Sequence, residues 1–256
     1  MELLLLKIVI GFIVGILIGM SGVGGGVLLL PVLIFGLRVP PIVAVGSDAL
    51  FNFFTKIPAS LMHLKKGTVR RKVVLALALG SVPGSIAGVK LLMHIRHLYG
   101  DGVNNFIKTA VGILLIIIPT LLLFQRHIED RIANRPPTLK GFAGMAVIGL
   151  VAGFLVGMTS VGSGSIIMML LLLLYSFPPK VNVGTDIVHA VLLTGVTGML
   201  HLRLGNVDPA LVMTLLIGSI PGGLIGSHLA TRMPMIWLRR MLCALLLITG
   251  ARMLWA

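Results

Sequence analysis

Two aspartates lie inside long hydrophobic segments of the chain. Asp48 follows the letters AVGS and Asp186 follows NVGT, whereas the other acidic residues lie near segment ends or in polar stretches. An ionisable side chain at membrane depth is costly to maintain, so it is a functional candidate by default. A carboxyl group at this depth can take up and release a proton, and we therefore predict that Asp48 and Asp186 are proton-coupling residues.

Polar side chains continue beyond each aspartate at the spacing of one helix face. The first stripe contains Asp48, Asn52, Lys56, Ser60 and His63, and the second contains Asp186, His189, Thr194, Thr197 and His201. Lys56 is the only cation near the middle of a hydrophobic segment, which suits an anion path; a neutralising pair with Asp48 is the alternative. Asn52 and Lys56 are predicted to bind substrate. The histidines are predicted to take part in proton coupling: His63, His189 and His201.

Some of these residues have a second, structural interpretation. Ser47 and Thr185 are predicted to bind substrate, but together with the aspartates that follow they are also plausible N-caps of helices that begin there. His63 and His201 lie near segment ends beside basic residues, so a place at the membrane interface is the alternative to proton transfer. The sequence leaves these alternatives open.

Two glycine-rich segments interrupt the hydrophobic sequence, GMSGVGGGV at residues 19–27 and GMTSVGSGS at residues 157–165. Glycine lets the backbone turn and lets a ligand approach closely, and free N–H groups at a helix start attract anions. We therefore predict an anion-binding turn in each segment, with hydroxyl donors beside it. The candidate residues are Ser21, Gly22, Gly24, Gly25, Gly26, Thr159, Ser160, Gly162, Ser163 and Gly164. Close packing of bare backbone is the alternative; a nucleotide loop is disfavoured because the Lys-Ser/Thr ending is missing.

The segments that must position these residues are hydrophobic helices. The chain is 57% hydrophobic and 11% charged, which indicates an integral membrane protein. Six apolar runs are long enough to span a bilayer: 3–20, 73–93, 106–124, 141–158, 209–230 and 236–256. Residues 41–63 and 179–201 form two more runs that carry the polar stripes, and residues 27–37 and 165–177 are too short to span unaided. We predict an all-α polytopic membrane protein with about 8 to 10 membrane segments, some glycine-broken or re-entrant.

The chain is an internal duplication. A shift of 138 residues aligns Gly11 with Gly149 and Leu91 with Leu229 without a gap, and 27 of the 81 aligned positions are identical. Repeat 1 covers residues 1–124, a polar linker covers 125–140, and repeat 2 covers 141–256. Duplicated membrane proteins with interrupted helices are typically transporters whose site lies at the repeat interface.

The distribution of basic residues bears on orientation and on partners. The formal net charge is +14, but Lys and Arg lie mostly at segment ends, which favours the positive-inside rule over nucleic-acid binding. Five basic residues flank the loop near residue 66, whereas Arg203 stands alone in the equivalent loop. Opposite insertion of two similar halves would produce this asymmetry, so we favour inverted repeats over parallel ones. No pattern predicts a cofactor or a metal, and homo-oligomerisation is left open.

Several quoted stretches resemble the sulfite exporter TauE/SafE family, also called the toluene sulfonate uptake permeases: GFIVGILIGMSGVGGGVLLLPVL, VGSDALFNF, VGTDIVHAVLLTGVTGMLHLRLGNVD and LIGSIPGGLIGSHLA. The resemblance covers both halves. It implies a multi-pass carrier of sulfite, sulfonates or related anions in the bacterial inner membrane. The family's glycine turn falls on residues 21–26 and 159–164, and its GTS pattern falls on 46–48 and 184–186. The chain departs from the pattern at Asp48 and Asp186, where many members have serine.

The resulting hypothesis is a transporter of small sulfur-containing anions that works by alternating access, with proton coupling as an option and the direction open. A passive anion channel is one alternative. A membrane-embedded enzyme using Ser21, His63 and Asp48 is another, although no Gly-x-Ser-x-Gly elbow or paired-histidine motif supports it.

Overall fold

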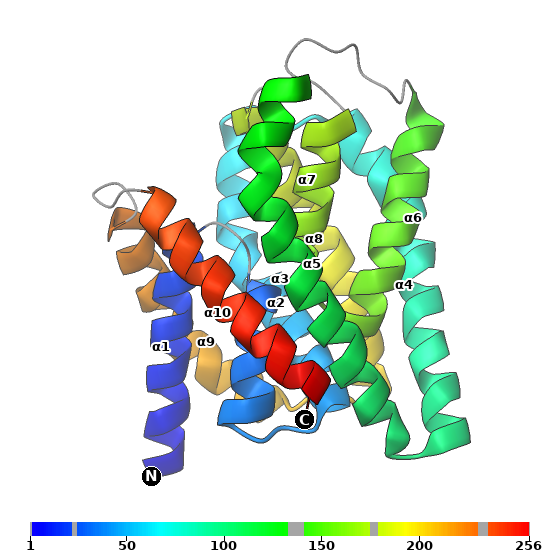
Figure 1. Cartoon of the computed structure of the whole chain (residues 1–256), viewed down its shortest axis with the longest axis vertical. Coiled ribbons are helices and arrows are strands. Elements are labelled where there is room, and N and C mark those ends of the chain that lie inside the picture. The colour runs from blue at the N-terminus through cyan, green and yellow to red at the C-terminus, as the bar shows by residue number, and fades with distance from the viewer. Residues whose placement is uncertain (1, 22–24, 133–140, 175–178, 230–234, 256) are drawn as a thin grey trace.

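The computed structural model describes residues 2–21, 25–132, 141–174, 179–229 and 235–255, which are helical apart from short connections (Figure 1). The helices are α1 (Glu2–Ser21), α2 (Gly25–Pro31), the π-helix η1 (Val32–Gly36), α3 (Pro41–Lys65), α4 (Arg71–Tyr99), α5 (Gly102–Ile132), α6 (Phe142–Thr159), α7 (Ser165–Leu174), α8 (Pro179–Arg203), α9 (Pro209–Leu229) and α10 (Met235–Trp255). The predicted all-α class is confirmed for this part of the chain. Helix α5 continues to Ile132, so the first eight residues of the predicted polar linker are helical.

Five described helices are long and apolar enough to cross a membrane: Arg71–Tyr99, Gly102–Leu121, Phe142–Thr159, Lys180–Arg203 and Pro209–Gly226. Their outward faces carry large exposed apolar side chains, such as Leu79 on α4 and Leu224 on α9. Backbone groups in a lipid environment must be satisfied internally, which a helix achieves by itself. The chain is therefore a multi-pass membrane protein.

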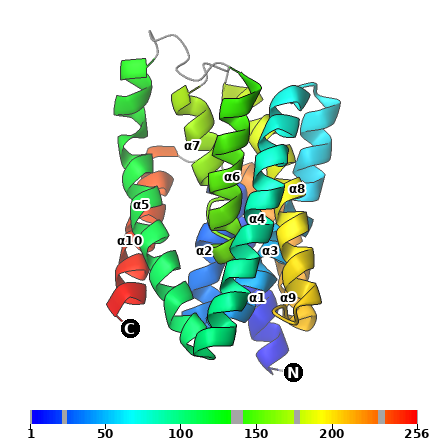
Figure 2. The ribbon, with the colours of Figure 1, turned by 90° about the vertical axis from the view of Figure 1, so that its right-hand side faces the viewer.

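Each glycine segment ends one helix and starts a shorter one. After Thr159, Ser160 has a left-handed φ of 57° and Gly162 has a φ of 98°, and α7 begins at Ser165. In the first segment α1 ends at Ser21 and α2 begins at Gly25. Figure 2 shows α7 towards one end of the molecule and α2 nearer the other. The two short helices thus lie at different depths of the bundle.

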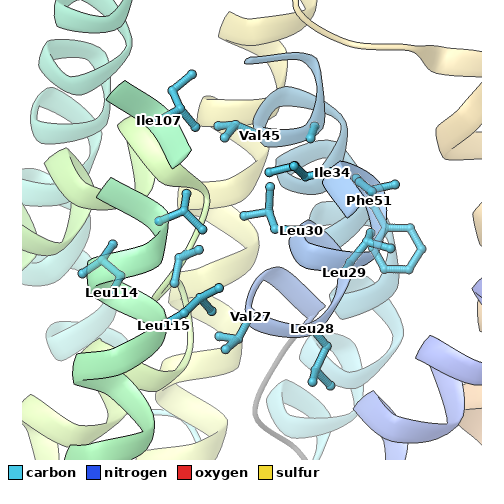
Figure 3. Close-up of a cluster of buried hydrophobic side chains, with 14 of the residues drawn as sticks. Val27, Leu28, Leu29, Leu30, Ile34, Val45, Phe51, Ile107, Leu114 and Leu115 are labelled. Atoms are coloured by element: carbon cyan, nitrogen blue, oxygen red, sulfur yellow. The ribbon is translucent and has the colours of Figure 1, made fainter. Parts of the chain in front are cut away.

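The short helix α2 is wrapped in protein. Its residues Val27, Leu28, Leu29 and Leu30 are buried, and they pack with Phe51 of α3 and with side chains of α5 (Figure 3). A segment too short to span the bilayer can lie at membrane depth only where other helices cover it.

Glycine faces hold the outer helices in pairs. A Cβ added to Gly80 of α4 would overlap the carbonyl of Ala146 on α6, and one added to Gly218 of α9 would overlap the carbonyl of Ile8 on α1. Gly84 and Gly88 make the same approach to α6, as Gly222 and Gly226 do to α1. In each pair, residue number rises in the same direction, so the packed helices run parallel. Small residues on the contact faces let the two backbones of each pair approach this closely.

The two helices that carry the polar stripes run antiparallel. A Cβ on Gly46, near the start of α3, would lie 2.9 Å from the Cβ of His201, near the end of α8. A Cβ on Gly184, near the start of α8, would lie 2.9 Å from Nδ1 of His63, near the end of α3. α3 and α8 therefore lie side by side, between the α1–α9 and α4–α6 pairs (Figure 1).

Candidate functional site

A buried carboxylate lies at the centre of the site. Asp48 is 0% exposed, and its Oδ2 accepts hydrogen bonds from Ser160 Oγ at 2.6 Å and from Asn52 Nδ2 at 3.0 Å. Its Oδ1 has no hydrogen-bond partner in the described part of the chain. Because Asn52 lies one helical turn beyond Asp48 and Ser160 lies in the second glycine segment, this carboxylate joins α3 to the opposite half of the chain.

The first glycine segment reaches the same carboxylate. A Cβ on Gly26, near the start of α2, would lie 2.7 Å from the backbone oxygen of Ser160, 3.0 Å from Asp48 Oδ2 and 3.5 Å from Asn52 Nδ2. Any larger residue would therefore force these groups apart. The two glycine segments lie against each other at this point, where Asp48 is held.

One cation lies beside this cluster. Lys56 Nζ donates a hydrogen bond to Ser163 Oγ at 3.1 Å, so the α3 stripe contacts the second glycine segment at two points. Lys56 interacts electrostatically with both Asp48 and Asp186. The equivalent position in the second half is Thr194. The charge arrangement is therefore asymmetric although the backbone arrangement is similar.

The second aspartate has a different environment. Asp186 is 5% exposed, and its Oδ1 has no hydrogen-bond partner among the residues described. One turn further, His189 is fully buried, with Nε2 2.8 Å from Ser81 Oγ and Nδ1 without a partner in the same described set. The sequence did not predict that Ser81 belongs to the site. Its repeat equivalent is Ser219, and the equivalent of His189 is Phe51, so only one half has the pair.

Ser47 and Thr185 hold loops. Ser47 Oγ accepts a hydrogen bond from the backbone N–H of Asp208, and Thr185 Oγ1 accepts one from the backbone N–H of Arg70. The alternative interpretation as N-caps is wrong, because α3 begins at Pro41 and α8 at Pro179. Proline suits the first helical turn, since its missing N–H is not needed there. Their role in substrate binding stays a prediction.

The two outer histidines are not equivalent. His201 is 0% exposed, and its Nε2 lies 3.1 Å from the carbonyl oxygen of Gly157, so the interfacial interpretation is wrong for it. His63 is partly buried and its Nδ1 lies 2.8 Å from the hydroxyl of Thr68, in the loop after α3. Of these two histidines, His201 contacts α6, the helix that ends at the second glycine segment, whereas His63 contacts a loop.

The remaining predicted residues belong to the two turns. Thr159 Oγ1 donates to the carbonyl of Leu155 and accepts from the N–H of Val161, which stabilises the end of α6. Gly162 supplies the positive φ, and the carbonyl of Gly164 accepts from Met168 in α7. Gly25 is the first residue of α2. Gly22, Gly24 and the side chain of Ser21 lie outside the described residues.

The cluster is closed in this conformation. Asp48, Asn52, Thr159 and Ser160 are fully buried. A groove of about 410 Å³ lies elsewhere, on the surface formed by Phe53 and one side of α8. Access of an anion to this cluster therefore requires movement of the helices around it. In the described part of the chain, no three His, Cys, Asp or Glu residues are grouped to hold a metal ion.

Comparisons with known proteins identify the family of the chain. The family model for "Sulfite exporter TauE/SafE" matches residues 7–253. "Probable membrane transporter protein YjnA" of Bacillus subtilis is 36% identical over 251 residues, which cover 96% of this chain and 98% of that protein. "Probable membrane transporter protein YunE" of the same organism is 30% identical over 249 residues, 88% of each chain. No solved structure gives a significant match. The chain belongs to the sulfite exporter TauE/SafE family and is a membrane transporter.

Proposed function

We propose that this transporter carries sulfite, organosulfonates or related small sulfur-containing anions by alternating access, through a site between the two glycine segments. The observation that carries the proposal is the convergence of Gly26, Ser160 and Ser163 on the stripe of α3, where Lys56 supplies a positive charge. A small oxyanion is bound by hydroxyl donors and by a cation, and Ser160, Ser163 and Lys56 carry such groups. The family's description supports the substrate class.

We further propose that the carrier consists of two inverted repeats, residues 1–124 and 141–256, with about 8 to 10 membrane segments when the short helices are counted. The antiparallel course of α3 and α8 supports inversion. A two-fold axis that relates two antiparallel helices is perpendicular to them, so it lies in the plane of the membrane. The glycine contacts support it as well: Gly46 faces His201 and Gly184 faces His63, and the 138-residue shift between the repeats relates the two contacts. The bacterial inner membrane is the proposed location.

Proton coupling is part of the proposal. The candidate groups are Asp48, Asp186, His63, His189 and His201. An inside-negative potential is worth about 2.3 kcal/mol per charge per 100 mV, so a divalent anion leaves a cell downhill and its uptake requires a coupling ion. Buried carboxyl and imidazole groups between the halves are suited to carry the accompanying protons.

The test is flux of labelled sulfite into proteoliposomes that contain the full chain. Lys56→Gln should reduce flux at least about tenfold, because a charged hydrogen-bond partner of the anion is lost. Lys90→Gln, which removes a cation at an exposed position of α4, is the matched control. Unchanged flux in Lys56→Gln would exclude the assigned site.

Two alternatives can be separated from carrier function. A passive channel would not show counter-flow, in which unlabelled sulfite on one side drives labelled sulfite from the other; the closed cluster favours a carrier. The enzyme alternative required His63 to act with Asp48, but fifteen residues along one helix place them about 22 Å apart.

A further inference from the structure

The hydroxyl of Ser160 is held by the chain's own carboxylate. Ser160 Oγ donates to Asp48 Oδ2 at 2.6 Å, and both residues are 0% exposed. Asp48 Oδ1 has no partner among the described residues. A short bond from a hydroxyl to a carboxylate is among the stronger protein hydrogen bonds. Ser160 therefore cannot donate to another anion while this bond is made, because a hydroxyl has one proton to donate.

The position of Ser160 indicates that its hydroxyl is needed. Its φ of 57° lies in the left-handed region, which costs a residue with a side chain more than it costs glycine. The equivalent residue in the first segment is Gly22. Strained positions of this kind are concentrated at functional sites. Position 160 thus carries a serine although glycine would fit its backbone conformation better.

Among the residues that the structure describes, this arrangement is made by Asp48 and not by Asp186. Asp48 is supported by Ser160 and Asn52, whose repeat equivalents are Gly22 and Ala190. Neither equivalent has a side-chain donor to offer Asp186. The two aspartates, although equivalent in sequence, are therefore held differently.

We infer that Asp48 is a built-in competitor of the transported anion: its carboxylate and the cargo compete for the Ser160 hydroxyl. This inference rests on the proposed anion site. The cargo gains the hydroxyl when the carboxylate turns away, and the carboxylate takes it back when the cargo leaves. Gly26 permits the state in which the carboxylate holds the hydroxyl, because a Cβ there would lie 3.0 Å from Asp48 Oδ2.

The experiment is a double-mutant cycle on the full chain in detergent, with sulfite as the probe and calorimetry as the measurement. Asp48→Asn should bind sulfite about ten- to hundredfold more tightly than the wild type, because a charged acceptor is replaced by a weaker neutral one. Asp101→Asn, which removes an exposed carboxylate in the connection before α5, should bind as the wild type does.

The second half of the cycle separates competition from charge repulsion. Ser160→Gly removes the shared hydroxyl and suits the left-handed backbone, so it should fold. In this background the gain from Asp48→Asn should shrink about tenfold or more, since nothing is left to compete for. An equal gain in both backgrounds would overturn the inference, because repulsion alone would then explain it.

Further outcomes distinguish this inference from the proposed function. Binding by the wild type with no gain in Asp48→Asn would overturn the competition and leave the anion site standing. No sulfite binding by any variant would overturn both. If Asp48→Asn does not fold, Asp48→Ala, whose side chain cannot reach Ser160, should show the same gain and the same loss of it beside Ser160→Gly.

Discussion

Replacing Gly26 with alanine measures how closely α2 approaches the second glycine segment. The added Cβ would lie 2.7 Å from the backbone oxygen of Ser160 and 3.0 Å from Asp48 Oδ2, whereas ordinary contacts are 3.4–4 Å. The carbonyl cannot swing aside as a flexible side chain can, so the backbone must move. Overpacking of this kind typically costs about 1–3 kcal/mol.

The cost can be read as a melting temperature. For a chain of this size about 1 kcal/mol shifts the midpoint by about 2–4 °C, so Gly26→Ala should lower it by about 2–12 °C. The assay is thermal unfolding of the purified protein in detergent at a fixed scan rate, because membrane proteins often unfold irreversibly.

The matched control is Gly223→Ala in α9. Its Cβ would meet only the carbonyl oxygen of Gly15, at an ordinary 3.8 Å. Inside a helix, alanine is more favourable than glycine by up to about 1 kcal/mol, so the unfolding midpoint of Gly223→Ala should stay the same or rise. Equal midpoints for Gly26→Ala and Gly223→Ala would refute the close approach, and with it the meeting of the two segments.

Three further predictions use the same thermal assay. Ser81→Ala should lower the free energy of unfolding by about 1–3 kcal/mol, because a buried nitrogen of His189 loses its hydrogen-bond partner. Ser219→Ala should leave the stability unchanged or raise it, because the Ser219 hydroxyl has no partner in the described part of the chain. Equal effects of the two variants would contradict the asymmetry of the halves. Gly80→Ala and Gly218→Ala should both lower the midpoint, since each Cβ would overlap a carbonyl of the facing helix, and tolerance at either position would disprove that packing. Ser47→Ala should cost about 0.5–1.5 kcal/mol through loss of its hydrogen bond to the amide before α9; a loss of sulfite flux at an unchanged midpoint would instead favour substrate binding.

Hydrophobic length and glycine content were sufficient to predict the helices from the sequence. The runs 41–63 and 179–201 correspond to α3 and α8, and the glycine segments end α1 and α6 where the pattern indicated. The N-cap interpretation failed because the prolines at 41 and 179 start both helices several residues earlier. Proline in the first turn is itself a helix-start signal, and both positions carry it in the sequence.

The partners within the site could not be predicted in the same way. Ser160 and Asp48 are 112 residues apart in sequence, and Ser81 and His189 are 108 apart. Repeat symmetry does not supply these pairs, because Gly22 and Phe51 stand at the equivalent positions of Ser160 and His189. Contacts that break the symmetry depend on how the halves pack, and only the three-dimensional arrangement gives them.

The parallel glycine-packed pairs have a consequence for how this carrier can move. Each pair packs a helix of the first half against a helix of the second: α1 against α9, and α4 against α6. A rocking motion of the first half against the second would break the backbone contacts within both pairs. For alternating access we therefore expect the moving blocks to combine helices of both halves, one block on each flank of α3 and α8.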